Sequence, residues 1–429
     1  MACERKAVTM SFQKYHGEPD SRTDHKTYIK KRILGNLLKG LDSQPGIKAN
    51  IKKKVLKYWL KKLVRQDNET AKQSITIKEL IGEIADQEYN ENSNKVLLVE
   101  FNWYHGECIP GFYKYLSDLN YDVDLLVNEG LLKEKAFDVI KCNHIYNCDI
   151  ELMGLLLQYV LIEQYQFVIF NSNAFTWKGG WHTVLQEFPF LFKYLDKIYV
   201  LEHQLEYLNK DLLEIGHVFF LTDKLSVDKR MVPVNCHWFG NTSLPRKNKV
   251  TRFITVGAID PVRRNFKALS DAVEFLYNHG IKNFHITVIG LGKLDVVNPA
   301  IRRFFTALGR VPYSTVHAEM RKADFFLTLL DPDNPDHDRY ITHGTSGSFQ
   351  LIYGFSKPCL IAGKFADIYG FSPENAVVYS DNSDLGLSMR KAIDMSEAEY
   401  EGIRNSLIHV SDDIYNKSLE NLKKALSDN

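Results

Sequence analysis

The chain has 429 residues, of which 45% are hydrophobic and 12% aromatic, a composition typical of well-packed globular domains and not of disordered chains. Its 54 basic and 53 acidic residues leave a net charge of +1, so no global field selects nucleic acid as a partner. The length exceeds that of one ordinary core and favours two domains with an appendage.

The spacing of the cysteines and the lengths of the apolar runs indicate the compartment in which we expect the protein. The six cysteines are dispersed without CxxC or CxxH pairs, which indicates reduced thiols and argues against a zinc site. The first residues lack the apolar core of a signal peptide, and no run of about 18 apolar residues is present to span a membrane. We therefore expect a cytoplasmic protein, either free or bound peripherally to a membrane.

Residues 1–94 are polar and Lys-rich and lack strand-like runs, which predicts a helical extension. Within it, apolar residues between Ile51 and Val64 recur at helical spacing, and lysines occupy the other side. Such a basic helix over residues 47–65 suits an anionic membrane surface, with Trp59 at the interface. The alternative is that the apolar stripe packs on the main body and the lysines are solvated.

From residue 95 short apolar runs alternate with amphipathic helical patterns, which predicts a parallel sheet with crossover helices. A polar stretch containing Pro245 provides a hinge, so we expect a first Rossmann-like domain over residues 95–245. The strands are expected at 96–101, 122–127, 167–170, 197–201 and 218–221, with a helix at 110–119.

A second series of the same kind predicts a second Rossmann-like domain over residues 246–408, followed by a long helical tail from about residue 396 to residue 426. The fold class is therefore α/β, with two doubly wound domains facing each other and a helical N-terminal extension. Ligands of such sheets bind beyond the carboxyl ends of the strands. The strands are expected at 251–256, 284–289, 324–330 and 359–361, with helices at 267–278 and 313–322.

A turn rich in glycine and hydroxyl groups, from Thr342 to Ser348, precedes a helix expected at 349–355, and a strand is expected to lead into it. Glycine lets the backbone approach a ligand, and the N-terminus of a helix favours negative charge. The turn therefore predicts a diphosphate cradle, with an ordinary strand-to-helix loop as the alternative. The cradle residues are Gly344, Thr345, Ser346, Gly347 and Ser348.

Three segments of the second half resemble GT-B glycosyltransferases. Val256 to Asn265 resembles the strand, glycine turn and basic residue that open the nucleotide-binding domain of that family. Gly309 to Asp324 is similar to its G-x-V-P…A-D segment, and Thr342 to Pro358 to its T-H-x-G…S…G-x-P signature. The resemblance spans roughly residues 250–410.

The resemblance implies a metal-independent glycosyltransferase that uses a UDP- or GDP-sugar and no further cofactor. Its acceptor is expected to be a glycan or a lipid-linked glycan, and residues 409–429 are expected to form a helix that crosses back toward the first domain. Two positions depart from the family. Leu351, beside Gln350, replaces the glutamate that contacts the ribose, and His343 replaces the first glutamate of the retaining branch, so the anomeric outcome stays open.

On the donor side, departure of a diphosphate requires stabilising positive charge, and Arg263 and Arg264 follow the Gly257 turn directly. Gly290 ends the next strand of the predicted sheet and should lie at the same edge. His343 is expected to hydrogen-bond a phosphate or the sugar, unless it is only a loop-capping residue.

On the acceptor side, a loop after the first strand resembles the His-bearing loop of inverting relatives. His105 is our candidate for the general base, and Glu107 is either the alternate base or the carboxylate that orients it. We place Asn173, Trp177 and His203 near the acceptor because they follow neighbouring strands.

Three alternatives accompany this interpretation. The acidic segment Asp331 to Asp338 resembles a cation site, but its two prolines favour an irregular surface loop, and we expect no metal site. The same scaffold also suits a nucleotide-sugar epimerase, which needs no acceptor. The third alternative is a non-catalytic module that binds a partner through its Lys-rich extension.

Overall fold

The computed structural model describes residues 94–223, 228–240, 242 and 248–427. The predicted basic helix at 47–65 and its membrane contact lie outside these residues, as does most of the predicted hinge around Pro245. Within the described ranges no helix is both long enough and apolar enough to cross a membrane.

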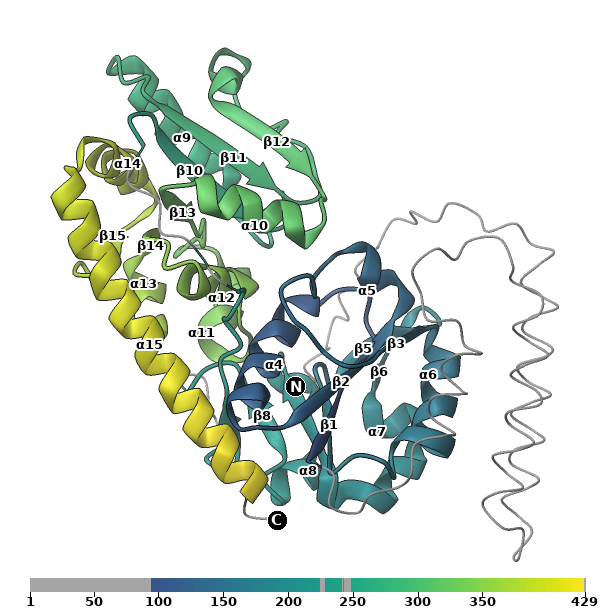
Figure 1. Ribbon diagram of the computed structural model, residues 1–429. Coiled ribbons are helices and arrows are strands. Elements are labelled where there is room, and N and C mark those ends of the chain that lie inside the picture. The colour runs from purple at the N-terminus through teal and green to yellow at the C-terminus, as the bar shows by residue number, and fades with distance from the viewer. Residues whose placement is uncertain (1–93, 224–227, 241, 243–247, 428–429) are drawn as a thin grey trace, which may run out of the picture. The chain divides into compact units, whose positions relative to one another are not determined.

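The first part of the described chain forms a seven-stranded sheet whose neighbouring strands all run parallel. Its spatial order is β3-β2-β1-β4-β7-β8-β9 (Figure 1). The strands are β1 Lys95–Glu100, β2 Asp122–Asn128, β3 Ile145–Cys148, β4 Phe167–Phe170, β7 Ile198–Glu202, β8 Val218–Phe220 and β9 Val232–Pro233. The main connecting helices are α4 Ile109–Asp118, α5 Glu129–Lys133, α6 Ile150–Leu156, α7 Val184–Glu187 and α8 Lys210–Glu214.

The second part forms a six-stranded parallel sheet in the order β12-β11-β10-β13-β14-β15. The strands are β10 Thr251–Val256, β11 Phe284–Ile289, β12 Phe305–Gly309, β13 Phe325–Leu327, β14 Cys359–Ala362 and β15 Val377–Tyr379. The helices are α9 Phe266–Asn278, α10 Tyr313–Lys322, α11 Arg339–Thr342, α12 Gly347–Gly354, α13 Gly363–Ala366 and α14 Leu385–Asp394. In both sheets the chain starts in the middle, winds one way and then the other, which is the doubly wound arrangement. The predicted α/β class is confirmed.

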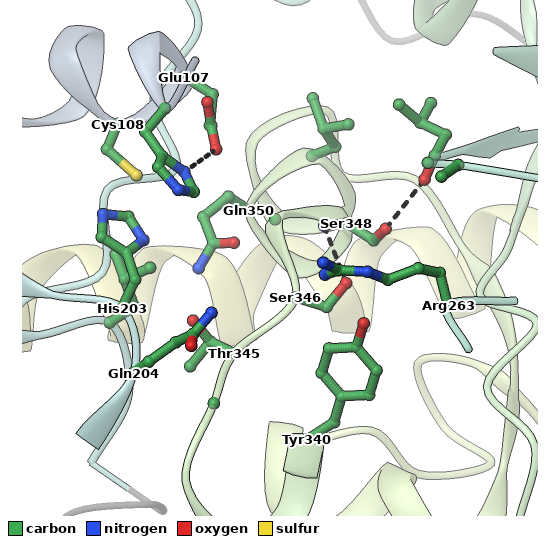
Figure 2. Close-up of a pocket in the computed structure, with 18 of the residues that line it drawn as sticks. Glu107, Cys108, His203, Gln204, Arg263, Tyr340, Thr345, Ser346, Ser348 and Gln350 are labelled. Atoms are coloured by element: carbon green, nitrogen blue, oxygen red, sulfur yellow. Dashed lines mark hydrogen bonds and ion pairs between the residues drawn. The ribbon is translucent and has the colours of Figure 1, made fainter. Parts of the chain in front are cut away.

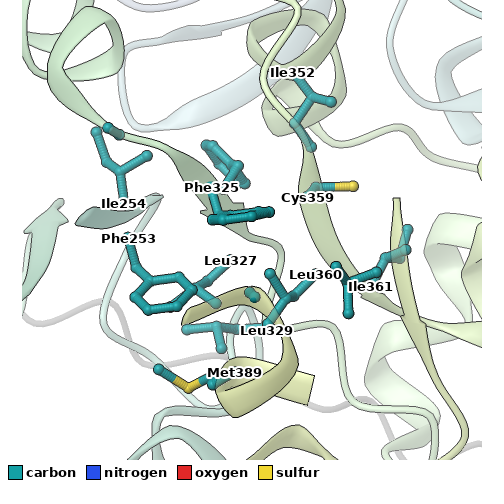
Figure 3. Packing of buried hydrophobic residues seen from close by; sticks show 14 of the residues in the cluster. Phe253, Ile254, Phe325, Leu327, Leu329, Ile352, Cys359, Leu360, Ile361 and Met389 are labelled. Carbon is teal, nitrogen blue, oxygen red and sulfur yellow. The ribbon is translucent and has the colours of Figure 1, made fainter. Parts of the chain in front are cut away.

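Most residues of the central strands β1, β4, β7 and β13 are buried, whereas β10 and β11 also carry exposed or half-buried polar residues such as Arg252 and His285. In the second sheet Phe253, Phe325 and Leu360 are almost fully buried and pack with Met389 of α14 (Figure 3). Full burial of such side chains contributes about 1.5–3 kcal/mol each. This packing holds the ends of the strands, and the loops that leave them, in fixed positions.

A single long helix, α15 Glu397–Ser427, contacts the cores of both sheets (Figure 1). Its first half buries Tyr400 in the second core, and its last turns bury Leu422 and Leu426 in the first. The Tyr199 hydroxyl also donates a 2.9 Å hydrogen bond to the Ala425 carbonyl. The helix therefore ties the two sheet domains to each other.

Between β4 and β7 the chain forms an antiparallel hairpin, β5 Ala174–Trp177 and β6 Gly180–Thr183, that belongs to neither large sheet. The predicted acceptor-side residue Trp177 lies in this hairpin, which the sequence did not predict. Gly179, with φ of 82°, allows the tight reversal between the two strands.

Candidate active site

A cavity of about 530 Å³ lies at the carboxyl ends of the strands of both sheets. One wall comes from the loops after β1 and β7 of the first sheet, and the other from the loop after β10 and the turn before α12 of the second. In each sheet the winding direction changes beside β1 or β10, and ligands of doubly wound sheets bind at this change.

Two glycines shape the wall behind β10. Gly257 has φ of 142° and lines the cavity. Gly290 has φ of 154°, and a Cβ there would lie 1.8 Å from the Gly257 carbonyl oxygen. Only glycine fits at position 290, but this residue packs behind the wall and is not among those that line the cavity.

Arg264 lies at the centre of the second-sheet wall and is only 5% exposed. Its guanidinium donates to the Ser348 hydroxyl at 2.6 Å and to the Ser346 hydroxyl at 3.3 Å. It also donates to the carbonyls of Arg263 and Val256. The guanidinium is therefore fixed in orientation before any ligand arrives, with its Nε left without a partner.

Two further arginines, Arg263 and Arg339, line the cavity beside Arg264. Among the described residues none of the three is paired with a carboxylate, and burial, together with the charges of Arg263 and Arg339, lowers the pKa of Arg264. The effect of their charge is visible on Tyr340. Burial acts to raise the pKa of its hydroxyl, but Arg264 and Arg339 outweigh it and the pKa is lowered. Uncompensated positive charge of this kind favours an anionic ligand.

The predicted cradle lies on the same wall, but the element before it differs from the prediction. The expected strand 324–330 ends early, at β13, and an irregular loop and α11 lead into the turn. Helix α12 also begins at Gly347, two residues before the expected start. All five cradle residues line the cavity.

The cradle is held from both sides. The Gly344 N–H donates to the Arg339 carbonyl at 2.8 Å, and the Leu205 N–H of the first domain donates to the His343 carbonyl at 3.0 Å. The His343 ring is exposed at the rim, where its Nδ1 lies 2.8 Å from the Thr342 hydroxyl. The serine hydroxyls of the turn therefore hold Arg264, while Thr345 and the turn backbone line the open space.

The acidic segment before the turn forms a closed hydrogen-bonded loop. The Asp331 carboxylate accepts hydrogen bonds from the side chains of Asn265 and Asn382, at 2.7 Å each. His337 accepts from the Asp331 N–H and lies 3.2 Å from the Pro261 carbonyl. In the described part of the chain no group of three or more His, Cys, Asp or Glu side chains is placed to hold a metal ion. The loop supports the Pro261–Arg264 segment.

The opposite wall carries His105, in the loop after β1. Its backbone is left-handed, with φ of 67° and ψ of 13°, and its carbonyl accepts a 2.7 Å hydrogen bond from the Asn171 amide. Strained conformations of this kind occur often at functional sites. Nδ1 lies 3.3 Å from Glu107 Oε1, which leaves Nε2 as the free ring nitrogen.

Charge on Glu107 decides the basicity of His105. Burial acts to lower the pKa of His105, but the hydrogen bond and charge of Glu107 outweigh it and raise the pKa above its usual value. Burial acts to raise the pKa of Glu107, but His105 and the Tyr313 hydroxyl bring it down to about 2. Glu107 is thus ionised at any working pH, and it makes His105 a stronger base.

His203 also lies on this wall, stacked on His105 with ring centroids 4.3 Å apart. Its Nε2 lies 3.0 Å from the Asn171 carbonyl, so this nitrogen is the donor. Burial, and to a smaller extent the charge of His105, lowers the pKa of His203 to about 3. His203 is therefore neutral and a weaker base than His105.

Two buried glutamates hold the loops that carry these histidines. Glu100, at the end of β1, accepts from Asn171 at 2.7 Å, and Glu202, at the end of β7, accepts from Asn173 at 2.8 Å. Asn173 is thus buried and does not line the cavity, and neither does Trp177, whose ring lies under the Lys178 ammonium. Of the predicted acceptor-side residues, only His203 reaches the cavity.

Several residues that line the cavity were not predicted as site residues from the sequence. Gln350 is buried with its Oε1 unpartnered and lies between the two walls (Figure 2). Tyr313 follows the Gly309–Pro312 motif directly, and Arg339 and Tyr340 lie just before Thr342. Their closeness in sequence to a recognised motif was the signal that could have identified them.

Neither a scan against protein-family models nor a search of curated proteins finds a match for this chain. Solved structures do match. A glycosyltransferase from Rickettsia africae ESF-5 is 10% identical with a TM-score of 0.51, over 79% of this chain and 98% of that one. Anabaena Alr3699/HepE, solved in complex with UDP and glucose, is 10% identical with a TM-score of 0.50, over 78% of this chain and 100% of that one.

The chain has the GT-B fold. The predicted resemblance is thereby confirmed for the fold, on which two doubly wound domains flank one cleft. At this level of identity the likeness establishes the GT-B architecture alone, so the activity has to be argued from the side chains that line the cleft.

Proposed function

We propose that the protein is a GT-B glycosyltransferase that moves a sugar from a UDP- or GDP-linked donor to a hydroxyl acceptor. One observation carries the proposal. A single cavity has three arginines on one wall, none of them paired with a carboxylate of the described residues, and a His–Glu pair on the other wall, contributed by the other domain. The first wall suits a departing diphosphate, and the second suits removal of a proton.

The arginine wall is the proposed donor site. In transfer, the bond between the anomeric carbon and the diphosphate oxygen breaks, and negative charge grows on that oxygen. Arg264, fixed by Ser346 and Ser348, supplies a charge that needs no reorganisation, and Arg263 and Arg339 add to it. The donor therefore needs no metal ion to neutralise its leaving group.

The His105 wall is the proposed site of acceptor activation. Nε2 of His105 takes the proton of the acceptor hydroxyl while the hydroxyl oxygen bonds to the anomeric carbon. The Glu107 carboxylate stabilises the imidazolium that forms. A direct displacement of this kind inverts the configuration of the anomeric carbon.

Gln350 is the proposed contact to the transferred sugar. Its Oε1 is buried and unpartnered, which is costly unless a ligand supplies a donor. A sugar hydroxyl between the two walls would supply that donor. The GT-B family keeps a ribose-binding glutamate one position further on, where this chain has Leu351, so we assign Gln350 to the sugar and leave the ribose to other contacts.

Thermal unfolding with UDP, GDP, ADP and dTDP tests the proposal. A ligand at about 100 times its dissociation constant stabilises the folded state by about 2.7 kcal/mol, so the preferred nucleotide should raise the melting temperature and the others should not. Incubation with the matching nucleotide sugar in the absence of acceptor then separates transfer from epimerisation. Interconversion of the sugar without an acceptor would favour the epimerase, and the absence of any nucleotide-dependent shift would contradict both enzymes.

A further inference from the structure

The β5–β6 hairpin presents one face to the core and the other to solvent. Phe175 faces inward, with its ring centroid 5.0 Å from that of Phe101. On the outward face Thr176 and Trp181 lie directly opposite each other in the strand register. Trp181 is 54% exposed, as exposed as Leu387 and less so only than Leu291 among the large hydrophobic side chains that the structure describes. The core packing fixes the hairpin, so the exposed ring is presented on a rigid support.

The Trp181 ring is stacked on Tyr207, with centroids 5.7 Å apart and an angle of 23° between the planes. Tyr207 is itself fixed, because its carbonyl accepts a 2.7 Å hydrogen bond from the buried Asn173 amide. Asn173 is anchored in turn by Glu202. A mostly exposed tryptophan held in this way forms a preorganised apolar surface.

This surface is continuous with the proposed active site at both ends. Tyr207 directly follows Glu206, which lines the cavity. At the other end the Tyr104 hydroxyl lies 2.9 Å from the Thr176 hydroxyl, and the Tyr104 ring centroid is 4.9 Å from that of His105. We call Tyr104, Thr176, Trp181 and Tyr207 the aromatic shelf.

Charge limits what the aromatic shelf can bind. The first-domain side of the cavity carries the carboxylates Glu107 and Glu206, whereas the arginines all lie on the donor wall. An anionic acceptor would meet like charge beside His105. A neutral ligand with many hydroxyl groups avoids that repulsion and can hydrogen-bond to Thr176 and Tyr104.

We propose that the aromatic shelf binds the acceptor and that the acceptor is a neutral saccharide. The flat C–H face of a pyranose ring covers the exposed Trp181 ring, and the hydroxyl groups at its edge reach polar atoms of the shelf. The proposal rests on the proposed function, because it directs a hydroxyl of the same saccharide, or of the next unit along the chain, to Nε2 of His105.

A glycan-array experiment with the full chain and saturating UDP or GDP tests this proposal. The array carries neutral oligosaccharides and acidic ones that contain uronic acid or sialic acid. We expect capture by neutral oligosaccharides, weakened roughly tenfold or more in Trp181→Ala and largely restored in Trp181→Phe. The matched control is Phe192→Ala, because Phe192 is 48% exposed but does not line the cavity or contact the shelf. Nucleotide-induced thermal shifts should be equal in all variants, which shows that each variant is folded.

Three results overturn the proposal. They are capture confined to acidic oligosaccharides, capture of none, and equal capture by wild type and by a Trp181→Ala variant that retains the nucleotide shift. Each would leave the donor site intact, so the proposed function would stand. A fourth result separates the two proposals: the protein captures neutral oligosaccharides, but no nucleotide raises its melting temperature. The saccharide site would then be supported, and the transferase function would fail.

Discussion

The Tyr313 hydroxyl donates a 2.6 Å hydrogen bond to Glu107 Oε2, so a residue of the second domain holds the carboxylate that orients His105 in the first. The same segment makes two more contacts across the cleft. Arg310 pairs with Glu134 at 2.8 Å, and the Tyr313 N–H donates to the Glu134 carbonyl at 2.7 Å. The proposed base is therefore complete only when both domains are in place.

A double-mutant cycle on Tyr313 and Glu107 measures this link. Tyr313→Phe removes one donor to a charged acceptor, and Glu107→Gln removes the charge, so we expect each to lower kcat/KM and their effects to be less than additive. The expected coupling energy is about 1–3 kcal/mol. Tyr113→Phe is the matched control, since that hydroxyl also makes a 2.6 Å hydrogen bond but lies outside the cavity. Strict additivity would show that Tyr313 does not act through Glu107.

Replacement of His105 by alanine should lower kcat by about 10²- to 10⁴-fold, because the general base is lost. The dissociation constant of the nucleotide should change little, since His105 lies on the wall opposite the arginines. His144→Ala is the control, because His144 lies 3.3 Å from Asp124, in the same pairing geometry but outside the cavity. Full activity of His105→Ala, or a product with retained anomeric configuration in NMR, would remove His105 as the base.

The pH dependence of kcat/KM should follow the pKa of His105. A base must be unprotonated, so activity should rise with pH, with its acidic limb above the usual histidine pKa of 6.5 because Glu107 raises the pKa of His105. In Glu107→Gln only burial and the remaining charges act on His105, its pKa falls, and the limb should move to lower pH. An acidic limb at the same pH in both proteins would assign it to another group.

Much of this fold could be predicted because the central strands are rich in buried apolar residues. Residues 167–170, 251–256 and 284–289 were predicted with the bounds that the structure gives to β4, β10 and β11. Each lies inside a sheet with most of its residues buried, which leaves a clear apolar pattern in the sequence. The fold resemblance followed from this rhythm together with the motifs of the second domain.

The edges of the sheets were not predictable in the same way. The strands β3, β9 and β15 are short and lie at the edges of their sheets, and a short edge strand gains its conformation from its neighbour and not from its own pattern. The β5–β6 hairpin was missed because Lys178-Gly179-Gly180 reads as a loop, and the register that exposes Trp181 depends on the packing of Phe175.

The sequence indicated which loops form the candidate site, but it did not indicate the contacts that each side chain makes there. Arg263 and Arg264 were equivalent in sequence, yet the first is exposed and the second is buried against two serines. Asn173 was predicted near the acceptor, and it instead binds a buried glutamate. Such differences depend on contacts between residues far apart in the chain, including Tyr313 with Glu107, which no local pattern reports.

Arg264 and Arg263 should differ in what they contribute. Arg264→Ala removes the fixed charge and one donor from each of two buried serine hydroxyls, so we expect weaker nucleotide binding and a lower melting temperature without ligand. Arg263→Ala removes an exposed charge, so we expect weaker nucleotide binding with an unchanged melting temperature. Arg303→Ala, an arginine stacked on Tyr277 far from the cavity lining, is the control. Nucleotide affinity equal to wild type in both Arg263 and Arg264 variants would exclude this wall as the diphosphate site.

The most direct test of the transferase proposal is the release of nucleoside diphosphate from a panel of UDP- and GDP-sugars in the presence of EDTA and neutral oligosaccharides. We predict that one donor class yields UDP or GDP in step with glycosylated product. We also predict that the Arg263→Ala/Arg264→Ala double variant loses several kcal/mol of transition-state stabilisation. No release from any donor, or release at an unchanged rate in the double variant, would contradict the account.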